Sequence, residues 1–346
     1  MDKFIKSIKK NTIFLLIITI LVLFFLLKDN FISIYKNITN INVFWLFIAL
    51  LCVLIYWICQ SLCTHMIAKE YSKNLKFETI FKQNLITQFF NGITPFSTGG
   101  QPMAIYMLKE SGIKTTHSTN IILQNFILYQ MALIFMGFIA VILNYSLNLF
   151  PQVDLLRKLI ILGFGINSLV GIALLFISFS KKFNKEIIFK IIDILSKFKI
   201  IKNKKAKQEK WSKLLLEFHD SAELFRNNKK IFIKGFVYHF IGLLFFYIVP
   251  IFVVFSLKDY HSLNIINTLT SSAYVLIMGS FVPIPGGSGG IEYGYMAFFG
   301  TFLSESILST SLLLWRFITY YLGILIGGIM LNFYKGGHEN ENRTIH

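Results

Sequence analysis

Charged side chains are missing from long stretches of this 346-residue chain. Five runs contain no Asp, Glu, Lys or Arg, namely 13–27, 42–64, 119–144, 159–180 and 235–257, and a sixth, 307–333, contains only Arg316. Most of these runs reach the roughly 20 residues that an α-helix needs to cross about 30 Å of hydrocarbon. The pattern excludes a soluble globular domain. It predicts an all-α polytopic membrane protein with about six spanning helices.

Cysteine is also scarce, and the recognised motifs of several enzyme classes are missing. The three cysteines Cys52, Cys59 and Cys63 all fall in the second apolar run, so we expect free buried thiols and neither a disulfide framework nor a zinc site. The sequence contains no phosphate-binding loop, nucleophile elbow, zinc-protease helix or dinucleotide fingerprint. We therefore expect no catalytic residue, cofactor or metal.

Proline, with six residues in all, is concentrated in two glycine-rich segments inside uncharged apolar sequence, 91–102 and 283–292. Pro removes a backbone donor and clashes one turn back, so neither segment can continue a straight helix. Irregular backbone at membrane depth persists only where protein buries it or where it lines a wet cavity. Paired broken segments in two halves of a membrane protein are typical of a binding site. We predict two re-entrant helical hairpins with these segments at their tips.

Acidic residues are half as common as basic ones, 17 against 34, and the basic residues are concentrated in blocks. Positively charged loops favour the cytoplasmic side, which places both termini, 69–82, the loop 181–230 and the tail 336–346 in the cytoplasm of a multi-pass protein. The two hairpins then enter from opposite sides, as in an inverted repeat. The loop 181–230 has helical apolar periodicity among its lysines. It either lies on the anionic inner leaflet or packs as a helical pair on the bundle. The charge gives no indication of direct nucleic-acid binding.

After each broken tip the chain re-enters a helix, so two half-helix N-termini point toward the membrane interior. Each offers unpaired N–H groups and a positive dipole end, which suit phosphate or carboxylate. The candidate substrate-binding residues at the tips are Thr98, Gly99, Gly100, Gln101, Gly286, Gly287, Ser288, Gly289 and Gly290. Each descending limb also carries a polar stripe at helical spacing, with Asn84, Gln88 and Asn91 in the first and Asn264, Thr268 and Ser271 in the second.

Glu292 and Arg316 are charged residues inside apolar sequence. At a rise of about 1.5 Å per residue they reach similar depth on adjacent antiparallel elements, so we predict an ion pair. An unpaired charge in hydrocarbon costs several kcal/mol, so intramembrane charges are functional candidates by default. The pair could lock the last span to the hairpin, contact an anionic headgroup, or do both.

The two tips, together with Tyr106-Met107-Leu108-Lys109 and Leu314-Trp315-Arg316-Phe317, resemble the membrane region of lysylphosphatidylglycerol synthases, a block that also occurs alone in small flippase-like membrane proteins. The resemblance covers residues 5–335 as one transmembrane domain. It implies a bacterial cytoplasmic-membrane protein that moves a phospholipid, such as a phosphatidylglycerol derivative, between leaflets. In longer relatives a cytosolic domain aminoacylates the lipid from aminoacyl-tRNA. Since this chain ends at His346, we expect no such domain here.

Two other functions stay open at this point. One is lysyl transfer to phosphatidylglycerol, in which this chain would act only with a separate aminoacyl transferase. The other is transport of a small anion coupled to protons through Glu292. The sequence is compatible with more than one lipid as substrate and with a homo-oligomer.

Overall fold

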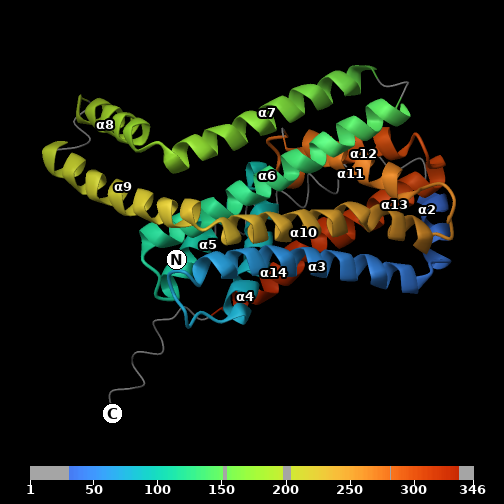
Figure 1. Ribbon diagram of the computed structural model, residues 1–346. Helices are drawn as coiled ribbons and strands as arrows, with labels where there is room; N and C mark the ends of the chain where they lie inside the picture. The colour runs from blue at the N-terminus through green and yellow to red at the C-terminus, as the bar shows by residue number, and fades with distance from the viewer. Residues whose placement is uncertain (1–30, 151–153, 198–203, 281, 335–346) are drawn as a thin grey trace, which may run out of the picture.

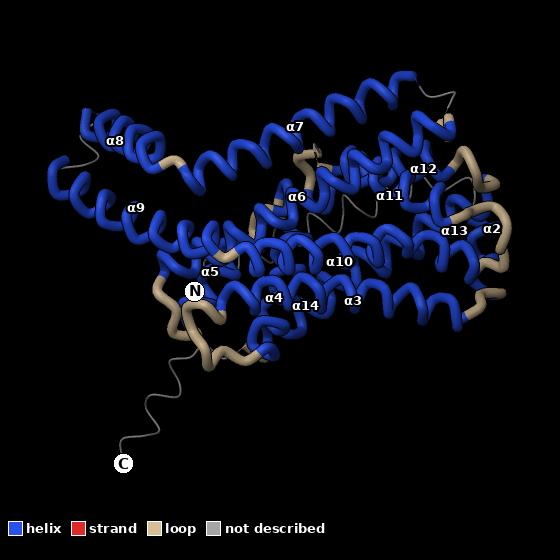
Figure 2. The backbone as a smooth tube through the Cα atoms, in the orientation of Figure 1, coloured by secondary structure: helices blue, strands red, loops and turns tan. Residues whose placement is uncertain are grey.

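Helices joined by short loops, without any strand, make up the part of the protein that the computed structural model describes, which is residues 31–150, 154–197, 204–280 and 282–334 (Figures 1 and 2). The expected first span, 13–27, and the tail 336–346 lie outside these residues. The predicted all-α fold is confirmed.

Four long apolar helices run alongside one another and form the body of the molecule (Figure 1). They are α3 (Val43–Ala68), α6 (Thr115–Leu147), α10 (Lys229–Ser256) and a last span, Glu305–Asn332. Each is long and apolar enough to cross a bilayer. Helix α7 (Asp154–Phe179) adds a shorter apolar stretch, Ile160–Ala173. The arrangement is that of a polytopic membrane protein.

Small residues allow α3 and α10 to pack closely along their length. A Cβ atom built on Gly242 of α10 would lie 3.1 Å from the Cβ of Cys59, and one built on Gly235 would lie 3.2 Å from the Sγ of Cys63. Close approach of small residues is the usual way in which membrane helices gain contact, because lipid provides no hydrophobic drive between them. Both cysteines are free and buried, as predicted, and they act here as small packing residues.

Two helical hairpins are inserted into this body from opposite ends (Figure 1). The first consists of α4 (Phe77–Ile93), a 3₁₀ turn at Pro95–Ser97 and α5 (Gly100–Glu110). The second consists of α11 (Ile265–Gly279), a 3₁₀ turn at Pro285–Gly287 and α12 (Gly290–Phe299). The two limbs of each hairpin pack together, and the two 3₁₀ turns contact each other. The tips predicted from proline and glycine therefore meet within the bundle.

The two tips share one backbone conformation over four residues. Thr94 and Ile284 are extended, with φ −116° and −102°, and each precedes a proline. The two residues after that proline have a positive φ in both tips, Phe96 and Ser97 in the first and Gly286 and Gly287 in the second. The tips diverge only afterwards. This correspondence supports the inverted-repeat interpretation of the sequence.

The last span is interrupted by one π-helical turn. It comprises α13 (Glu305–Arg316), the π turn η4 (Phe317–Tyr321) and α14 (Leu322–Asn332). Single π turns inside α-helices occur frequently at functional sites. Here the turn begins directly after Arg316 and includes Tyr320, near the middle of the span.

The remaining helices lie at the two ends of the bundle (Figure 1). Helix α2 (Phe31–Thr39) contacts α13 through Asn37, whose Nδ2 lies 3.0 Å from the hydroxyl oxygens of Ser306 and Thr310. At the opposite end, α8 (Lys181–Lys197) and α9 (Lys204–Asn227) form the helical pair expected for the basic loop. Helix α9 contacts α6, α7 and α10, whereas α8 keeps an exposed apolar face. We call the end of the bundle at which the lysine-rich helices α8 and α9 lie the basic end.

Candidate functional site

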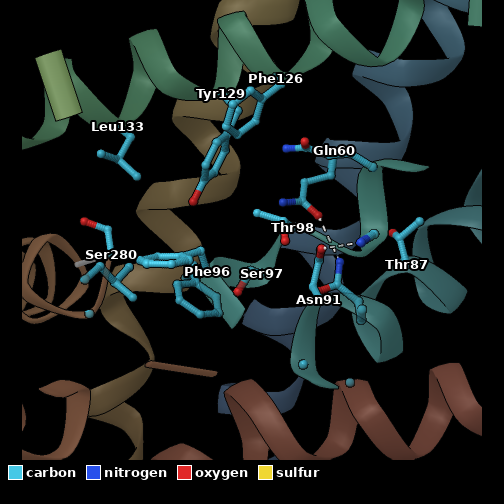
Figure 3. A pocket seen from close by; sticks show the side chains of 18 of the residues that line it. Gln60, Thr87, Asn91, Phe96, Ser97, Thr98, Phe126, Tyr129, Leu133 and Ser280 are labelled. Carbon is cyan, nitrogen blue, oxygen red and sulfur yellow. Dashed lines mark hydrogen bonds between the residues drawn. The ribbon is translucent and has the colours of Figure 1, made fainter. Parts of the chain in front are cut away.

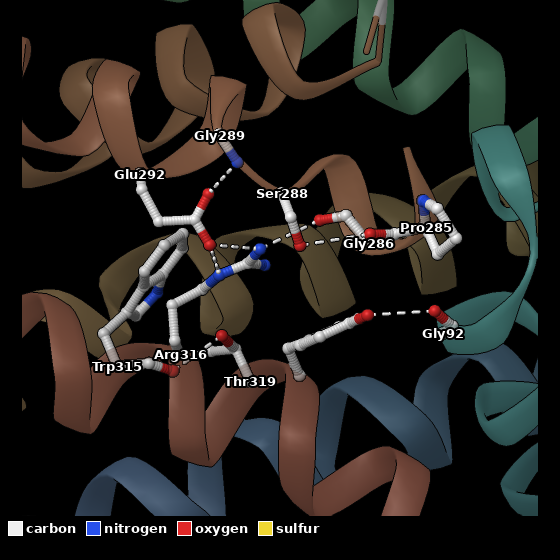
Figure 4. Close-up of polar contacts among 10 residues, drawn as sticks. Gly92, Pro285, Gly286, Ser288, Gly289, Glu292, Trp315, Arg316 and Thr319 are labelled. Atoms are coloured by element: carbon white, nitrogen blue, oxygen red, sulfur yellow. Dashed lines mark hydrogen bonds and ion pairs between the residues drawn. The ribbon is translucent and has the colours of Figure 1, made fainter. Parts of the chain in front are cut away.

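The predicted ion pair between Arg316 and Glu292 is present at the centre of the site (Figure 4). Atoms Nη2 and Nε of Arg316 lie 2.6 and 2.7 Å from Oε1 of Glu292. The other carboxylate oxygen, Oε2, accepts a 2.6 Å hydrogen bond from the backbone N–H of Gly289. The two side chains are 3% and 0% exposed, so each charge depends on the other for compensation.

Arg316 and Tyr320 connect the last span to both hairpin tips (Figure 4). Nη2 of Arg316 donates to the carbonyl oxygen of Gly286 at 3.0 Å. The guanidinium carbon lies 4.6 Å from the centre of the Tyr320 ring, and the Tyr320 hydroxyl donates to the carbonyl oxygen of Gly92 at 2.9 Å. Gly92 belongs to the last turn of α4, where helical carbonyls lose their partners. The tips are thus fixed relative to each other through one helical turn.

The prediction of free N–H groups at the half-helix N-termini is wrong for Gly99, Gly100 and Gly289. The N–H of Gly99 donates to Oγ1 of Thr94 at 2.8 Å, and that of Gly100 donates to Oδ1 of Asn91 at 3.0 Å. Gly289 is bonded to the carboxylate described above. Side chains of the hairpins themselves occupy these donors, as helix caps do. An anion would have to displace them.

A cavity of about 760 Å³ lies where the two tips meet the long helices (Figure 3). Its wall draws on α3, α6, α7 and α10 as well as on both hairpins and the π turn. Polar side chains from helices far apart in sequence point into it, among them Gln60, Asn91 and Ser280. Aromatic rings of Phe96 and Tyr129 lie beside them. The cavity is therefore mixed polar and aromatic, and it is buried among membrane-spanning helices.

The structure brings only part of the predicted site residues to this cavity. Those that line it are Asn84, Gln88, Asn91, Thr98, Gly100, Gln101, Gly286, Gly287 and Arg316. The cavity lining does not include Gly99, Ser288, Gly289, Gly290 or Glu292. Glu292 contributes indirectly, because it holds Arg316 in place.

The polar stripe of the second hairpin does not reach the cavity, in contrast to that of the first. Asn264 is the N-cap of α11, where its Oδ1 accepts from the N–H of Asn267 at 2.8 Å. The Thr268 hydroxyl donates to the carbonyl oxygen of Asn264, and Ser271 is fully buried in the packing of α11. Thr268 and Ser271 are therefore turned into the protein core and Asn264 is an exposed helix cap, so this stripe does not line the cavity.

Several lining residues were not singled out from the sequence. They are Gln60 on α3, Asn125 and Gln130 on α6, Asn167 on α7, His239 on α10, Ser280 after α11 and Tyr320 in the π turn. Amide side chains inside otherwise apolar runs were the available signal, since buried polar groups in membrane spans need partners. Two of them are bonded to each other, with Nε2 of Gln130 3.1 Å from Oδ1 of Asn167.

The cavity reaches the apolar outer surface of the bundle beside α7. Ile166 and Val170 line the cavity and are also 40% and 42% exposed. Neighbouring positions on the same helix, Leu162 and Leu169, are exposed apolar side chains. A side chain that contacts both a polar cavity and the lipid-facing surface marks an edge between the two environments. Polar interior and apolar surface are therefore continuous along α7.

Comparison with known proteins agrees with this architecture. The chain is similar to a protein of Archaeoglobus fulgidus described as a UPF0104 membrane protein, with 26% identity over 318 residues, which is 86% of this chain and 89% of the relative. The model of the family described as Lysylphosphatidylglycerol synthase TM region matches residues 12–327. The match covers the long apolar helices, both hairpins and the ion pair, and the chain therefore belongs to the lysylphosphatidylglycerol synthase TM region family.

Proposed function

We propose that this protein is a lipid translocase that moves a phospholipid between the leaflets of the cytoplasmic membrane. The observation that carries the proposal is a polar cavity at the meeting point of two hairpin tips, open beside α7 to an apolar surface. A phospholipid combines a polar headgroup with apolar acyl chains, and the cavity and the neighbouring surface match these two parts. Its headgroup would pass through the cavity while its acyl chains stay in the bilayer along Ile166 and Val170.

The position of the tips supports the same function. Each hairpin enters from a different end of the bundle, and its short helices end where the two tips meet, so the cavity lies between two hairpins that each extend only part of the way through the bundle. A site at the interface of inverted repeats is the arrangement in which movement of one repeat against the other exposes the site alternately to the two membrane faces.

Arg316 is the residue we assign to the lipid phosphate. Its Nε and Nη2 are bonded within the protein, whereas no hydrogen bond from the described residues reaches Nη1. The guanidinium also lines the cavity. Glu292 does not line it, so coupling of a small anion to protons through Glu292 is not favoured by this geometry.

Reconstituted vesicles carrying acyl-labelled fluorescent phosphatidylglycerol test the proposal. Protein-containing vesicles should expose inner-leaflet lipid to a membrane-impermeant quencher, and protein-free vesicles should not. Thr98→Trp would fill the cavity from an exposed tip position and should slow the movement severalfold. Thr301→Trp, exposed but outside the cavity, is the matched control and should leave it unchanged. Equal rates with and without protein would show that phosphatidylglycerol is not carried, and the same result with each of the further lipids named below would refute the proposed function.

A further inference from the structure

The chemistry of the cavity wall narrows the class of headgroup. Nine carboxamide side chains line the cavity among the described residues: Gln60, Gln83, Asn84, Gln88, Asn91, Gln101, Asn125, Gln130 and Asn167. Hydroxyl groups of Ser97, Thr98, Ser280 and Thr319 add to them. Arg316 is the one charged side chain in this described lining. The wall is thus strongly polar and nearly devoid of charge.

The one positive charge of this described lining already has a carboxylate on one side, and its remaining nitrogen, Nη1, is the one we assign above to the lipid phosphate. Glu292 neutralises Arg316 from behind, and both of its carboxylate oxygens are bonded, one to Arg316 and one to the N–H of Gly289. No Asp or Glu occurs among the described lining residues. An ammonium group in the cavity would therefore lie near the Arg316 guanidinium and would have no carboxylate beside it. Burial of an uncompensated ion costs much free energy.

Several amides keep one hydrogen-bonding atom available. Oδ1 of Asn91 accepts from Gly100, but no hydrogen bond from the described residues reaches its Nδ2. Nε2 of Gln88 donates to Oδ1 of Asn84, and no such bond reaches the Oε1 of Gln88. Oδ1 of Asn125 bonds to His239, with its Nδ2 likewise without a bond. Donors and acceptors therefore remain side by side on the wall.

Hydroxyl groups match such a wall, because each donates one hydrogen bond and accepts two. A site built to bond hydroxyls also rejects ligands that lack them, since its own polar groups would be left unpaired. Rings of Tyr56, Phe126 and Tyr129 offer apolar faces for the carbon side of a polyol. Aromatic bodies beside a few placed polar groups are typical of small-molecule sites.

We propose that the terminal group of the headgroup that this cavity takes is an uncharged polyol, either the glycerol beyond the phosphate of phosphatidylglycerol or a sugar, and that headgroups ending in an ammonium group, aminoacyl ones included, are disfavoured. This inference rests on the proposed translocation. It also separates this protein's substrate from the aminoacylated lipid to which the family's description refers.

A panel of four acyl-labelled lipids in the same vesicles tests the inference: phosphatidylglycerol, monoglucosyl diacylglycerol, phosphatidylethanolamine and lysylphosphatidylglycerol. We expect the two polyol lipids to cross at least about tenfold faster than the two that carry ammonium groups, a ratio equivalent to about 1.4 kcal/mol. Movement of the lysyl lipid as fast as the polyol lipids would overturn the proposal. If no lipid crosses faster than in empty vesicles, translocation itself is wrong.

Binding then tests the headgroup class independently of transport. Short-chain forms of the same four lipids, added to the purified protein in detergent, should raise the thermal unfolding temperature for the two polyol lipids only. Stabilisation by the lysyl lipid equal to or above that by phosphatidylglycerol would contradict the inference, whatever the transport result.

Introducing a carboxylate sharpens the test. Gln88→Glu keeps the shape of the side chain but places a negative charge in the cavity, so the preference should shift toward the lysyl lipid by roughly tenfold or more. Asn40→Asp makes the same change on the exposed surface beyond α2 and should leave the preference unchanged. An unaltered lipid preference in folded Gln88→Glu protein would show that this wall does not select the headgroup.

Discussion

Phe96 and Gly286 occupy matching positions at the two hairpin tips and hold the same left-handed backbone conformation, with φ 53° and 65°. Their side chains differ for a reason that only the second tip explains. A Cβ on Gly286 would collide with the Tyr320 ring, whereas Phe96 is 57% exposed and lies in the cavity (Figure 3). Glycine adopts this conformation freely, but a side chain pays for it with strain.

Replacing Phe96 by glycine should therefore stabilise the protein. The left-handed conformation costs a non-glycine residue about 1–2 kcal/mol, and the exposed ring loses little packing, so Phe96→Gly should raise the free energy of unfolding by about 1 kcal/mol. Thermal unfolding in detergent measures it. Phe138→Gly, at an exposed position within helix α6, should instead destabilise by about 1 kcal/mol. A lower unfolding temperature for Phe96→Gly would contradict the strain argument.

Gly286→Ala should have the opposite effect. The new methyl group meets the Tyr320 ring, which is held by Arg316 and by its bond to Gly92. Overpacking of this kind typically costs about 1–3 kcal/mol, in addition to the strain of the positive φ. Gly112→Ala provides the control, because Gly112 also has a positive φ but its added Cβ would meet nothing within 4 Å. Equal losses of stability in both variants would exclude a clash at the tip.

Removal of either charge of the buried pair between Glu292 and Arg316 should lower the free energy of unfolding. Glu292→Gln and Arg316→Gln should each destabilise the protein by about 3–5 kcal/mol, seen as a lower unfolding temperature or folded yield. A charge swap should not rescue it. Glu292 also caps Gly289 and Arg316 also holds the Gly286 carbonyl, so exchange leaves both backbone groups without their partners. Recovery of yield in the swapped double variant would mean that charge alone matters.

Single cysteines should report the two ends of the bundle from opposite sides of the membrane. In a background with Cys52, Cys59 and Cys63 replaced, cysteines placed at Asn74 and Gly112 should both react with a membrane-impermeant thiol reagent added on one side of the membrane. Both positions lie in loops at the basic end, before α4 and after α5. A cysteine at Thr301 should react only from the other side. We expect the basic end to face the cytoplasm. Labelling at Asn74 and Gly112 from opposite sides would rule out the first hairpin.

Helix α8 should lie on an anionic membrane surface. Its apolar residues Phe183, Ile187, Ile191 and Ile194 are 41%, 39%, 49% and 53% exposed, and lysines surround them. Backbone amides of α8 should exchange with deuterium more slowly in nanodiscs that contain phosphatidylglycerol than in zwitterionic ones. Ile191→Asn should remove this difference. Lys73→Gln, an exposed change elsewhere at the basic end, should not.

The local sequence was enough to predict the breaks but not the final roles of the residues around them. Pro95 and Pro285 cannot sit inside straight helices, so two tips followed directly from the chain. The capping of Gly99 by Thr94 and the capping of Gly289 by Glu292 depend on how each tip folds back, so the local sequence alone predicts free N–H groups there. Asn264 shows the same limit of local sequence, since an asparagine at a helix start can cap the helix, as it does here, or line a cavity.

The sequence by itself determined the membrane character, the approximate limits of the four long apolar helices, the two hairpins and the pairing of Glu292 with Arg316. The length of the apolar runs sets the helices that can span the membrane, and the chemistry of proline and glycine sets the hairpin tips. The cost of a lone charge in hydrocarbon requires Glu292 and Arg316 to pair with each other. The tertiary structure alone decided that Tyr320 joins Gly92 to the second tip and that Gln60, Asn125 and Asn167 meet around one cavity. Those contacts link positions up to 228 residues apart, and their geometry depends on how helices pack rather than on what each helix contains.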